Sequence, residues 1–315
     1  MKIRNKGFWA ALLSAVMLVS GCSGNNSDNS ASDSSDNNDK NSDNSYTATD
    51  SSDRVAAPQE ATIVKSTEQG NSGEVKLESG DIYAVISIKE YGDIKVKLYP
   101  DEAPYAVQNF IELANKGTYN GRNFHRVISG FMAQGGSANG DGTGGASAEG
   151  GSFKNEINTS LRHYYGAFCY ASAMGNMSDQ FYIVNNKENI DNIKELYNQY
   201  AEYYEYTKQQ YEAMKEAYAG DDAALAQIDI FVDFYGKSAE GAKAMADTCT
   251  DAVIEKYKNG GTPSLDGGYT VFGQTVEGFE VLDAISSVET EMGSDGAESK
   301  PVNDIIISSV TIHTA

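Results

Sequence analysis

Apolar and polar side chains alternate in two short runs near residue 90. Every second residue from Ile82 to Ile88 is apolar, and the same alternation returns from Ile94 to Leu98. A period of two is typical of a half-buried β-strand, and the sequence EYGD between the runs carries a glycine suited to a turn. The pattern predicts a β-hairpin over residues 81–99.

Helical spacing follows, and then strand-type sequence returns. Apolar residues recur at helical spacing after Pro104, which suits a first helical turn, and Gly117 suits the end of that helix. Beyond it the pattern predicts, in order, strands over 124–136, 167–173, 180–184 and 267–276, a short helix over 278–286 and a final strand over 305–313.

Residues 186–262 interrupt this β-rich pattern with polar, helical sequence. Apolar and aromatic residues follow one helical face from Ile193 to Tyr218, and seven of the chain's 20 tyrosines lie between Tyr197 and Tyr218. We expect a helical insertion. Two interpretations of its tyrosines stay open: an exposed arm that binds unfolded chains, or a hairpin whose aromatic face packs on itself or on the β-rich domain.

The first residues predict export. A basic start precedes an apolar run over 8–19 that is too short to span a bilayer, as in a secretory signal peptide over 1–21. The run ends in LVSGC, which resembles the lipobox of bacterial lipoproteins. This resemblance implies cleavage before Cys22 and lipid attachment to its sulfur, and two or more acyl chains anchor a protein stably. We expect an extracytoplasmic protein that is lipid-anchored to the cell membrane of a bacterium.

A spacer separates this anchor from the folded part. Residues 22–53 are dominated by Ser, Asn and Asp, which cannot bury enough apolar surface to fold, so this segment is predicted to be a disordered linker. Residues 54–80 are transitional, with strand-like sequence at 61–65 and 75–77.

Composition excludes several classes of function. The 45 acidic and 24 basic residues give a formal charge of −21, and without basic patches nucleic-acid binding is not expected. The three histidines lack metal-ligand spacing, so no metal site is predicted, and His125 is interpreted as a hydrogen-bonded core residue. No nucleophile elbow or phosphate loop is present. For Cys169 and Cys249, an unbridged pair is favoured over a disulfide.

One stretch calls for a chemical explanation. The sequence FHRVISGFMAQGG, residues 124–136, places Arg126 among apolar residues with no acidic partner in the stretch. Together with DGTGG, DQFYIV and LDGGYTVFGQTVEGFEVLDAI, it resembles the cyclophilin-type peptidyl-prolyl isomerases, over residues 81–185 and 263–315. The resemblance implies a mainly β fold, an eight-stranded antiparallel barrel capped by two helices, and an enzyme without a cofactor.

The resemblance also assigns Arg126 a role. An X–Pro amide isomerises slowly because resonance resists rotation about its C–N bond. Twisting leaves a lone pair on the prolyl nitrogen, and a fixed cation can donate a hydrogen bond to it, which favours the transition state. Arg126 matches the catalytic arginine of the family, and Gln134 matches the glutamine that holds the substrate backbone and orients this arginine.

Further residues match the lining of the family's proline pocket. The substrate-binding residues that the resemblance implies are Phe131, Met132, Ala171, Ser172, Gln180, Tyr182, Leu265 and Tyr269. Three of them depart from the usual pattern: Tyr182 replaces a phenylalanine, Ser172 an asparagine and Tyr269 a histidine. Ser264 stands near a tryptophan of the cyclosporin-sensitive members, so weak cyclosporin binding is expected.

These observations predict a membrane-anchored isomerase that assists folding of exported, proline-containing polypeptides. The alternative is a cyclophilin-fold binding protein or holdase that acts through its helical insertion. A solute-binding lipoprotein is a more remote reading, because the chain lacks a two-lobed α/β pattern.

Overall fold

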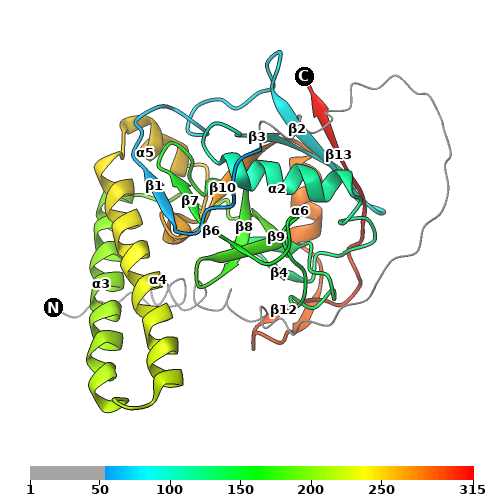
Figure 1. Ribbon diagram of the computed structural model, residues 1–315. Coiled ribbons are helices and arrows are strands. Elements are labelled where there is room, and N and C mark those ends of the chain that lie inside the picture. The colour runs from blue at the N-terminus through cyan, green and yellow to red at the C-terminus, as the bar shows by residue number, and fades with distance from the viewer. Residues whose placement is uncertain (1–53) are drawn as a thin grey trace.

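The computed structural model describes residues 54–315 (Figure 1). The predicted signal peptide over 1–21, the lipid attachment at Cys22 and the rest of the linker to residue 53 lie outside the described residues. No helix among the described residues is long and apolar enough to cross a membrane.

A single curled sheet dominates the described part of the chain (Figure 1). Its eight-strand path pairs every neighbour antiparallel. In spatial order the strands are β13 (Ile307–Thr314), β2 (Ile82–Ile88), β3 (Gly92–Leu98), β10 (Val271–Glu277), β8 (Ala167–Ala173), β9 (Asn176–Val184), β5 (Met132–Gly135) and β4 (Arg126–Ile128). The predicted eight-stranded antiparallel fold is confirmed.

The hairpin predicted around residue 90 is confirmed as β2 and β3. Ile86 lies opposite Ile94 across the pair, and neither side chain is exposed to solvent. The alternation therefore places one face of both strands in the main hydrophobic core.

Two helices cover this core, as expected. They are α2 (Pro104–Asn115) and α6 (Phe279–Ser286), and Phe110 of α2 and Leu282 of α6 are fully buried in the core cluster. The first turn of α2 has no side-chain cap of its own. Instead, the carboxylate of Glu156 accepts hydrogen bonds from the backbone N–H groups of Tyr105 and Ala106.

The prediction of one strand over 124–136 is wrong, because the chain reverses there. Strands β4 and β5 are joined by a tight turn in which Gly130 adopts a φ of 73°. This positive φ favours glycine, which carries no Cβ. The reversal places Arg126 directly opposite Gln134 in the antiparallel register.

Short strands at the edges complete the β structure. β1 (Thr62–Val64) pairs in parallel with β7 (Glu156–Asn158), and β6 (Phe153–Lys154) pairs with β9. The strand-like sequence at 75–77 forms no strand. β11 (Thr290–Met292) and β12 (Glu298–Pro301) form a hairpin that the sequence pattern did not predict.

The segment between β9 and β10 is helical. It comprises α3 (Ile193–Ala217), α4 (Asp222–Asp247), α5 (Asp251–Tyr257) and the short 3₁₀ turn η2 (Pro263–Leu265), and α3 and α4 form a long hairpin beside the sheet (Figure 1). Here we call residues 186–262 the insertion.

Most of the aromatic face of the insertion is packed. Tyr197 is fully buried in a cluster that also holds Tyr164 of the β-rich domain, and Tyr200 and Tyr204 are buried in the same cluster. Tyr206 and Tyr218, by contrast, are 61% and 43% exposed. The packing interpretation therefore accounts for the buried tyrosines, and only the exposed ones are left for partner binding.

Candidate active site

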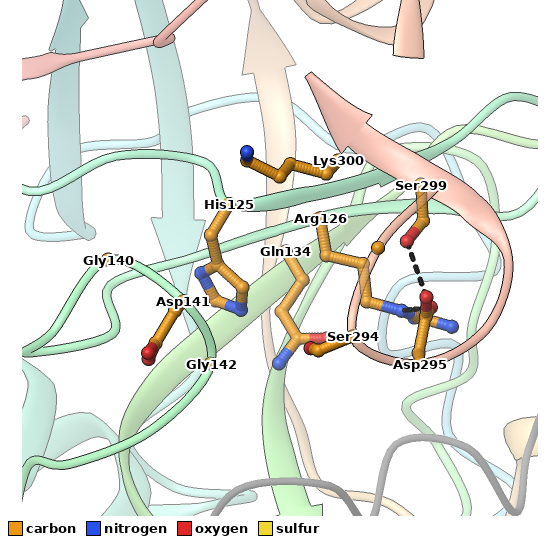
Figure 2. Close-up of a pocket in the computed structure, with 11 residues that line it drawn as sticks. His125, Arg126, Gln134, Gly140, Asp141, Gly142, Ser294, Asp295, Ser299 and Lys300 are labelled. Carbon is orange, nitrogen blue, oxygen red and sulfur yellow. Dashed lines mark hydrogen bonds and ion pairs between the residues drawn. The ribbon is translucent and has the colours of Figure 1, made fainter. Parts of the chain in front are cut away.

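Arg126 lies at the start of β4 with its guanidinium held by an acidic residue from far along the chain. Its Nε donates to Oδ2 of Asp295 at 2.7 Å, and only 9% of the Arg126 side chain and 5% of the Asp295 side chain are exposed. Asp295 belongs to the turn between β11 and β12 (Figure 2). The lone cation of the sequence therefore has a buried partner.

Asp295 is itself fixed in place. Its Oδ1 accepts from Ser299 Oγ at 2.8 Å and from the backbone N–H of Ala297 at 3.1 Å. Burial by itself raises the pKa of the Asp295 carboxyl, but these bonds and the charge of Arg126 outweigh it and hold the pKa below its usual value. Asp295 is thus an anion that orients the arginine fork.

The Nη1 side of the Arg126 guanidinium faces apolar side chains. Its Nη1 lies 3.6 Å from the sulfur of Met132, and the centre of the guanidinium lies 6.0 Å from the centre of the Phe131 ring. Both neighbours come from the same hairpin, since the turn after β4 leads directly into them. The cation therefore lies at the border of an apolar cluster.

This cluster brings together six of the predicted substrate-binding residues. It contains Phe131, Met132, Ala171, Tyr182, Leu265 and Tyr269, with residues of β8 and β10 around them. Met132, Tyr182 and Leu265 have no exposed surface and form its base, whereas Phe131 and Ala171 each retain 8% exposure. Only Phe131, Ala171 and Tyr269 among the six retain any exposed surface. We call this group the proline cluster.

The predicted polar residues lie beside Arg126. Gln134 donates through Nε2 to Oε1 of Gln180 at 3.2 Å, and Gln180 donates to the carbonyl of Gly142 at 2.9 Å. Within the described structure, the bond that orients Arg126 comes from Asp295, while Gln134 bonds to Gln180. The Oε1 of Gln134 and the hydroxyl of Ser172 are buried and have no hydrogen-bond partner among the described residues.

A cavity of about 270 Å³ opens next to the arginine. Figure 2 shows its lining, with the β4–β5 side chains facing the turn before β12 and the 140–142 loop. The lining residues are His125, Arg126, Gln134, Gly140, Asp141, Gly142, Gly293, Ser294, Asp295, Ser299 and Lys300.

His125 differs from its predicted role. It is buried, but neither ring nitrogen has a hydrogen-bond partner among the described residues, so the expectation of a hydrogen-bonded core histidine is wrong. Burial, with the nearby charge of Arg126, lowers the pKa of His125 to about 4. The ring is therefore neutral near pH 7, with both nitrogens buried at the edge of the cavity.

Sequence reasoning missed Asp295, and the local pattern offered no signal for it. The residue lies 169 positions from Arg126, in a hairpin that the sequence pattern did not indicate. The contact between Asp295 and Arg126 forms only when the two distant segments come together in the folded protein.

The described part of the chain contains neither a disulfide nor a cluster of metal-binding side chains. Cys169 and Cys249 are both unbridged there. Residues 54–315 contain no group of three or more His, Cys, Asp or Glu side chains arranged to hold a metal ion.

Comparison with known proteins shows the family of this chain. The profile of the family "Cyclophilin type peptidyl-prolyl cis-trans isomerase/CLD" matches residues 83–312. A Staphylococcus haemolyticus protein named as a peptidyl-prolyl cis-trans isomerase is 35% identical over 222 residues, which cover 70% of this chain and 86% of that protein. A Staphylococcus epidermidis protein of the same name is 31% identical over 239 residues, covering 75% of this chain and 94% of that protein.

A solved structure was also found. A Cryptosporidium parvum cyclophilin-type isomerase, crystallised in the presence of the dipeptide Ala-Pro, aligns with a TM-score of 0.46 and 23% identity, covering 74% of this chain and 99% of that one. The family profile spans most of the chain, and the Staphylococcus relatives match over most of their own length. The chain therefore belongs to the cyclophilin-type peptidyl-prolyl cis-trans isomerases.

Proposed function

We propose that this isomerase acts on X–Pro bonds of exported polypeptides and that Arg126 stabilises the twisted amide above the proline cluster. The observation that carries the mechanism is the position of Arg126. A buried guanidinium, fixed through Nε by Asp295, borders the apolar cluster with its terminal nitrogens.

The reaction needs little more than such a site. Rotation about the X–Pro bond has a barrier of roughly 20 kcal/mol, and no covalent bond is made or broken. In the twisted state the prolyl nitrogen gains a lone pair that the planar amide lacks. A guanidinium N–H aimed at that nitrogen therefore stabilises the transition state more than either planar form.

Asp295 supports this role because it fixes the donor before the substrate binds. A guanidinium is permanently charged, and one Asp bond through Nε leaves the terminal N–H groups for the substrate. Electrostatic catalysis is efficient when the donors need no reorganisation during the reaction. Gln134, with a free Oε1 beside the arginine, would accept a backbone N–H of the bound peptide.

The activity can be tested by NMR exchange between the cis and trans forms of an Ala-Pro-Phe peptide. The chain from Arg54 onward, which the structure describes, is compared with its Arg126→Ala variant. We expect accelerated exchange that disappears in the variant. If the variant still accelerates the exchange, the mechanism assigned to Arg126 is refuted. If folded wild-type protein does not accelerate the exchange, the isomerase activity itself is refuted.

The cellular setting is part of the proposal. The basic and apolar start of the chain and the LVSGC sequence support export and a lipid anchor on Cys22. In a bacterial host, labelled palmitate should be incorporated into the full chain and not into a Cys22→Ala variant. A wild-type chain that remains unlabelled and in the soluble fraction would contradict the anchor.

A second candidate, a holdase activity of the insertion, has one observation in its favour. Tyr206, Met214, Tyr218 and Ile230 of the α3–α4 hairpin are each more than 40% exposed, and exposed apolar side chains can hold unfolded chains. The Arg126→Ala variant separates the two candidates. Suppression of client aggregation by this variant would support a holdase, and loss of suppression together with isomerase activity would count against it.

Weak cyclosporin binding is also proposed. Ser264 lies near the position of a tryptophan in the cyclosporin-sensitive members, and it is buried with its carbonyl accepting from the hydroxyl of Tyr204 on α3. The drug would therefore lack a ring contact at this edge of the pocket. Titration of the exchange activity with cyclosporin should show weak inhibition, and tight stoichiometric inhibition would contradict it.

A further inference from the structure

One buried carboxylate joins the insertion to the β-rich domain. Asp266 follows η2, and its side chain is fully buried. Oδ1 accepts from the backbone N–H of His163 and from its ring Nδ1, both at 2.7 Å. Oδ2 accepts from the hydroxyls of Tyr197 on α3 and Tyr257 on α5. Two donors therefore come from the β-rich domain and two from the insertion.

These bonds stabilise the charge of Asp266. Burial alone raises the pKa of its carboxyl, but the bond from His163 and the nearby charge of Arg162 outweigh burial and hold the pKa below its ordinary value. A buried anion is tolerated when its oxygens are saturated with donors. Removing any one donor therefore disturbs the position of the others.

His163 links Asp266 to the proline cluster through hydrogen bonds on both of its ring nitrogens. Because the carboxylate only accepts, Nδ1 of His163 carries a proton, and Nε2 forms a hydrogen bond with the hydroxyl of Tyr182 at 2.8 Å. The two rings are stacked, with an interplanar angle of 13°. Tyr182 has no exposed surface and packs edge-on against Tyr269 of the same cluster.

Packing of the insertion against the same segment is close. Gly241 of α4 lies so near Gly267 that a Cβ on Gly241 would stand 2.0 Å from the carbonyl oxygen of Gly267. Arg162, also fully buried, donates to the carbonyls of Met245 and Thr248 at 3.2 Å. The segment that carries Asp266 is thus held by α3, α4 and α5 together.

We infer that the insertion is a positioning element of the isomerase: Tyr197 and Tyr257 fix Asp266, Asp266 fixes His163, and His163 fixes the Tyr182 hydroxyl at the base of the proline cluster. This inference rests on the proposed function, because it assumes that the substrate proline binds in that cluster. His163 and Asp266 are positioning residues. Neither they nor Tyr197 and Tyr257 need to contact the substrate.

The mechanism explains why a tyrosine in place of the family's phenylalanine matters at position 182. A buried hydroxyl must keep a hydrogen-bond partner. The Tyr182 hydroxyl bonds to His163 and also interacts with the side chain of Cys169. A tilt of His163 therefore moves the Tyr182 ring or breaks one of these bonds, and the shape of the proline cluster changes with it. Arg126 and Asp295 take no part in this chain of bonds, so the effect belongs to substrate binding rather than to turnover.

A double-mutant cycle tests the inference. We compare wild type, Tyr257→Phe, Tyr182→Phe and the double variant, and we measure KM and kcat separately by NMR exchange. Tyr257→Phe should raise KM about fivefold and leave kcat within about twofold of wild type. In the Tyr182→Phe background the same change should raise KM no further, since the hydroxyl that transmits the shift is absent.

Matched variants separate positioning from a purely structural role. Loss of folded protein lowers the apparent kcat and leaves KM unchanged, which is the opposite of the predicted split. Tyr211→Phe is the control, because Tyr211 stacks on Phe231 and Tyr235 within the hairpin and is not part of the Asp266 network; its KM should equal that of wild type. Tyr197→Phe replaces Tyr257→Phe if the latter does not fold.

The outcomes are distinct. A KM increase that is equal in both backgrounds, or no increase at all, would overturn the coupling while leaving the activity intact. A wild-type protein without exchange catalysis would instead overturn the proposed function, and it would be seen before any variant of the insertion is measured.

Discussion

Arg126 is a cation largely removed from water, and its neighbours decide what it can do. Asp295 neutralises its charge and fixes one nitrogen, while Met132 and Phe131 lie against the rest of the group. A buried charge needs a partner with good geometry, which Asp295 provides. The terminal N–H groups, of which Nη1 contacts the sulfur of Met132, lie at the edge of an apolar cluster, where a hydrogen bond is stronger than in water.

His125 should make the stability of the protein depend on pH, because its buried environment opposes protonation of the ring. Its pKa is lowered from 6.5 in an unfolded chain to about 4 in the folded protein. Above pH 6.5 the ring is neutral in both states and contributes nothing to the pH dependence. As the pH falls from 6.5 towards 4, only the unfolded state takes up the proton, so the folded state loses about 3 kcal/mol of stability.

Urea unfolding at pH 7 and near pH 4 measures this loss. The His125→Gln variant, which cannot titrate, is the control and should lose about 3 kcal/mol less than wild type over the same interval. Equal losses in the two proteins would show that His125 takes up its proton in the folded state at an ordinary pKa.

The site residues that could be predicted from the sequence are those that lie close together along the chain. Phe131, Met132 and Gln134 lie within eight residues of Arg126, so one motif indicated them together, and the hairpin turn brings them around the guanidinium. Asp295 could not be predicted, because its contact forms only when a distant hairpin folds over β4. The sequence around His125 indicates only an apolar strand. It therefore could not predict that the buried ring lacks a hydrogen-bond partner.

At the scale of elements, hydrophobic periodicity predicted the regular parts well. β2, β3, α2 and α6 are close to the predicted ranges, since each buries one continuous face in the main core. The turn at Gly130 and the β11–β12 hairpin escaped prediction. The first divides an apolar run that looks continuous, and the second carries few buried apolar residues.

Gly241 gives the prediction for the contact between α4 and the segment after η2. A Cβ at this position would lie 2.0 Å from the backbone oxygen of Gly267, so Gly241→Ala must push the helix away. We expect it to lower the free energy of unfolding by about 2 kcal/mol or more. Thermal or urea unfolding would measure the change.

Gly236 of the same helix is the matched control. A Cβ there would meet only the flexible side chain of Lys208, at 3.6 Å. Gly236→Ala should therefore be neutral or stabilise by up to about 1 kcal/mol, through the helix propensity of alanine. Destabilisation of both variants to the same degree would contradict the close approach of α4.

At the scale of the whole molecule, the insertion is integrated with the enzyme rather than attached to its surface. Sequence alone left open whether its tyrosines formed an arm or a packed face, because helical periodicity does not say what a face packs against. The structure places Tyr197 and Tyr257 on a carboxylate of the β-rich domain and leaves Tyr206 and Tyr218 exposed.

Excision of the insertion tests this integration. Its ends are adjacent, since Asn186 donates through its side chain to the carbonyl of Gly261 at 2.8 Å, so residues 188–259 can be replaced by a short linker. Asp266 and Arg162 would then lose buried partners. We expect a loss of roughly 3 kcal/mol or more in the free energy of unfolding. Unchanged unfolding and unchanged KM would show that the insertion is a separable arm.

The central claim is that Arg126 acts on the twisted amide rather than on substrate binding. The most direct measurement is NMR titration and line-shape analysis of one Ala-Pro-Phe peptide with wild type and Arg126→Ala, which yields Kd and the exchange rate in the bound state. We expect Arg126→Ala to lower the bound-state rate about 100-fold or more and to change Kd less than about threefold. A variant that keeps the bound-state rate and loses affinity would contradict it.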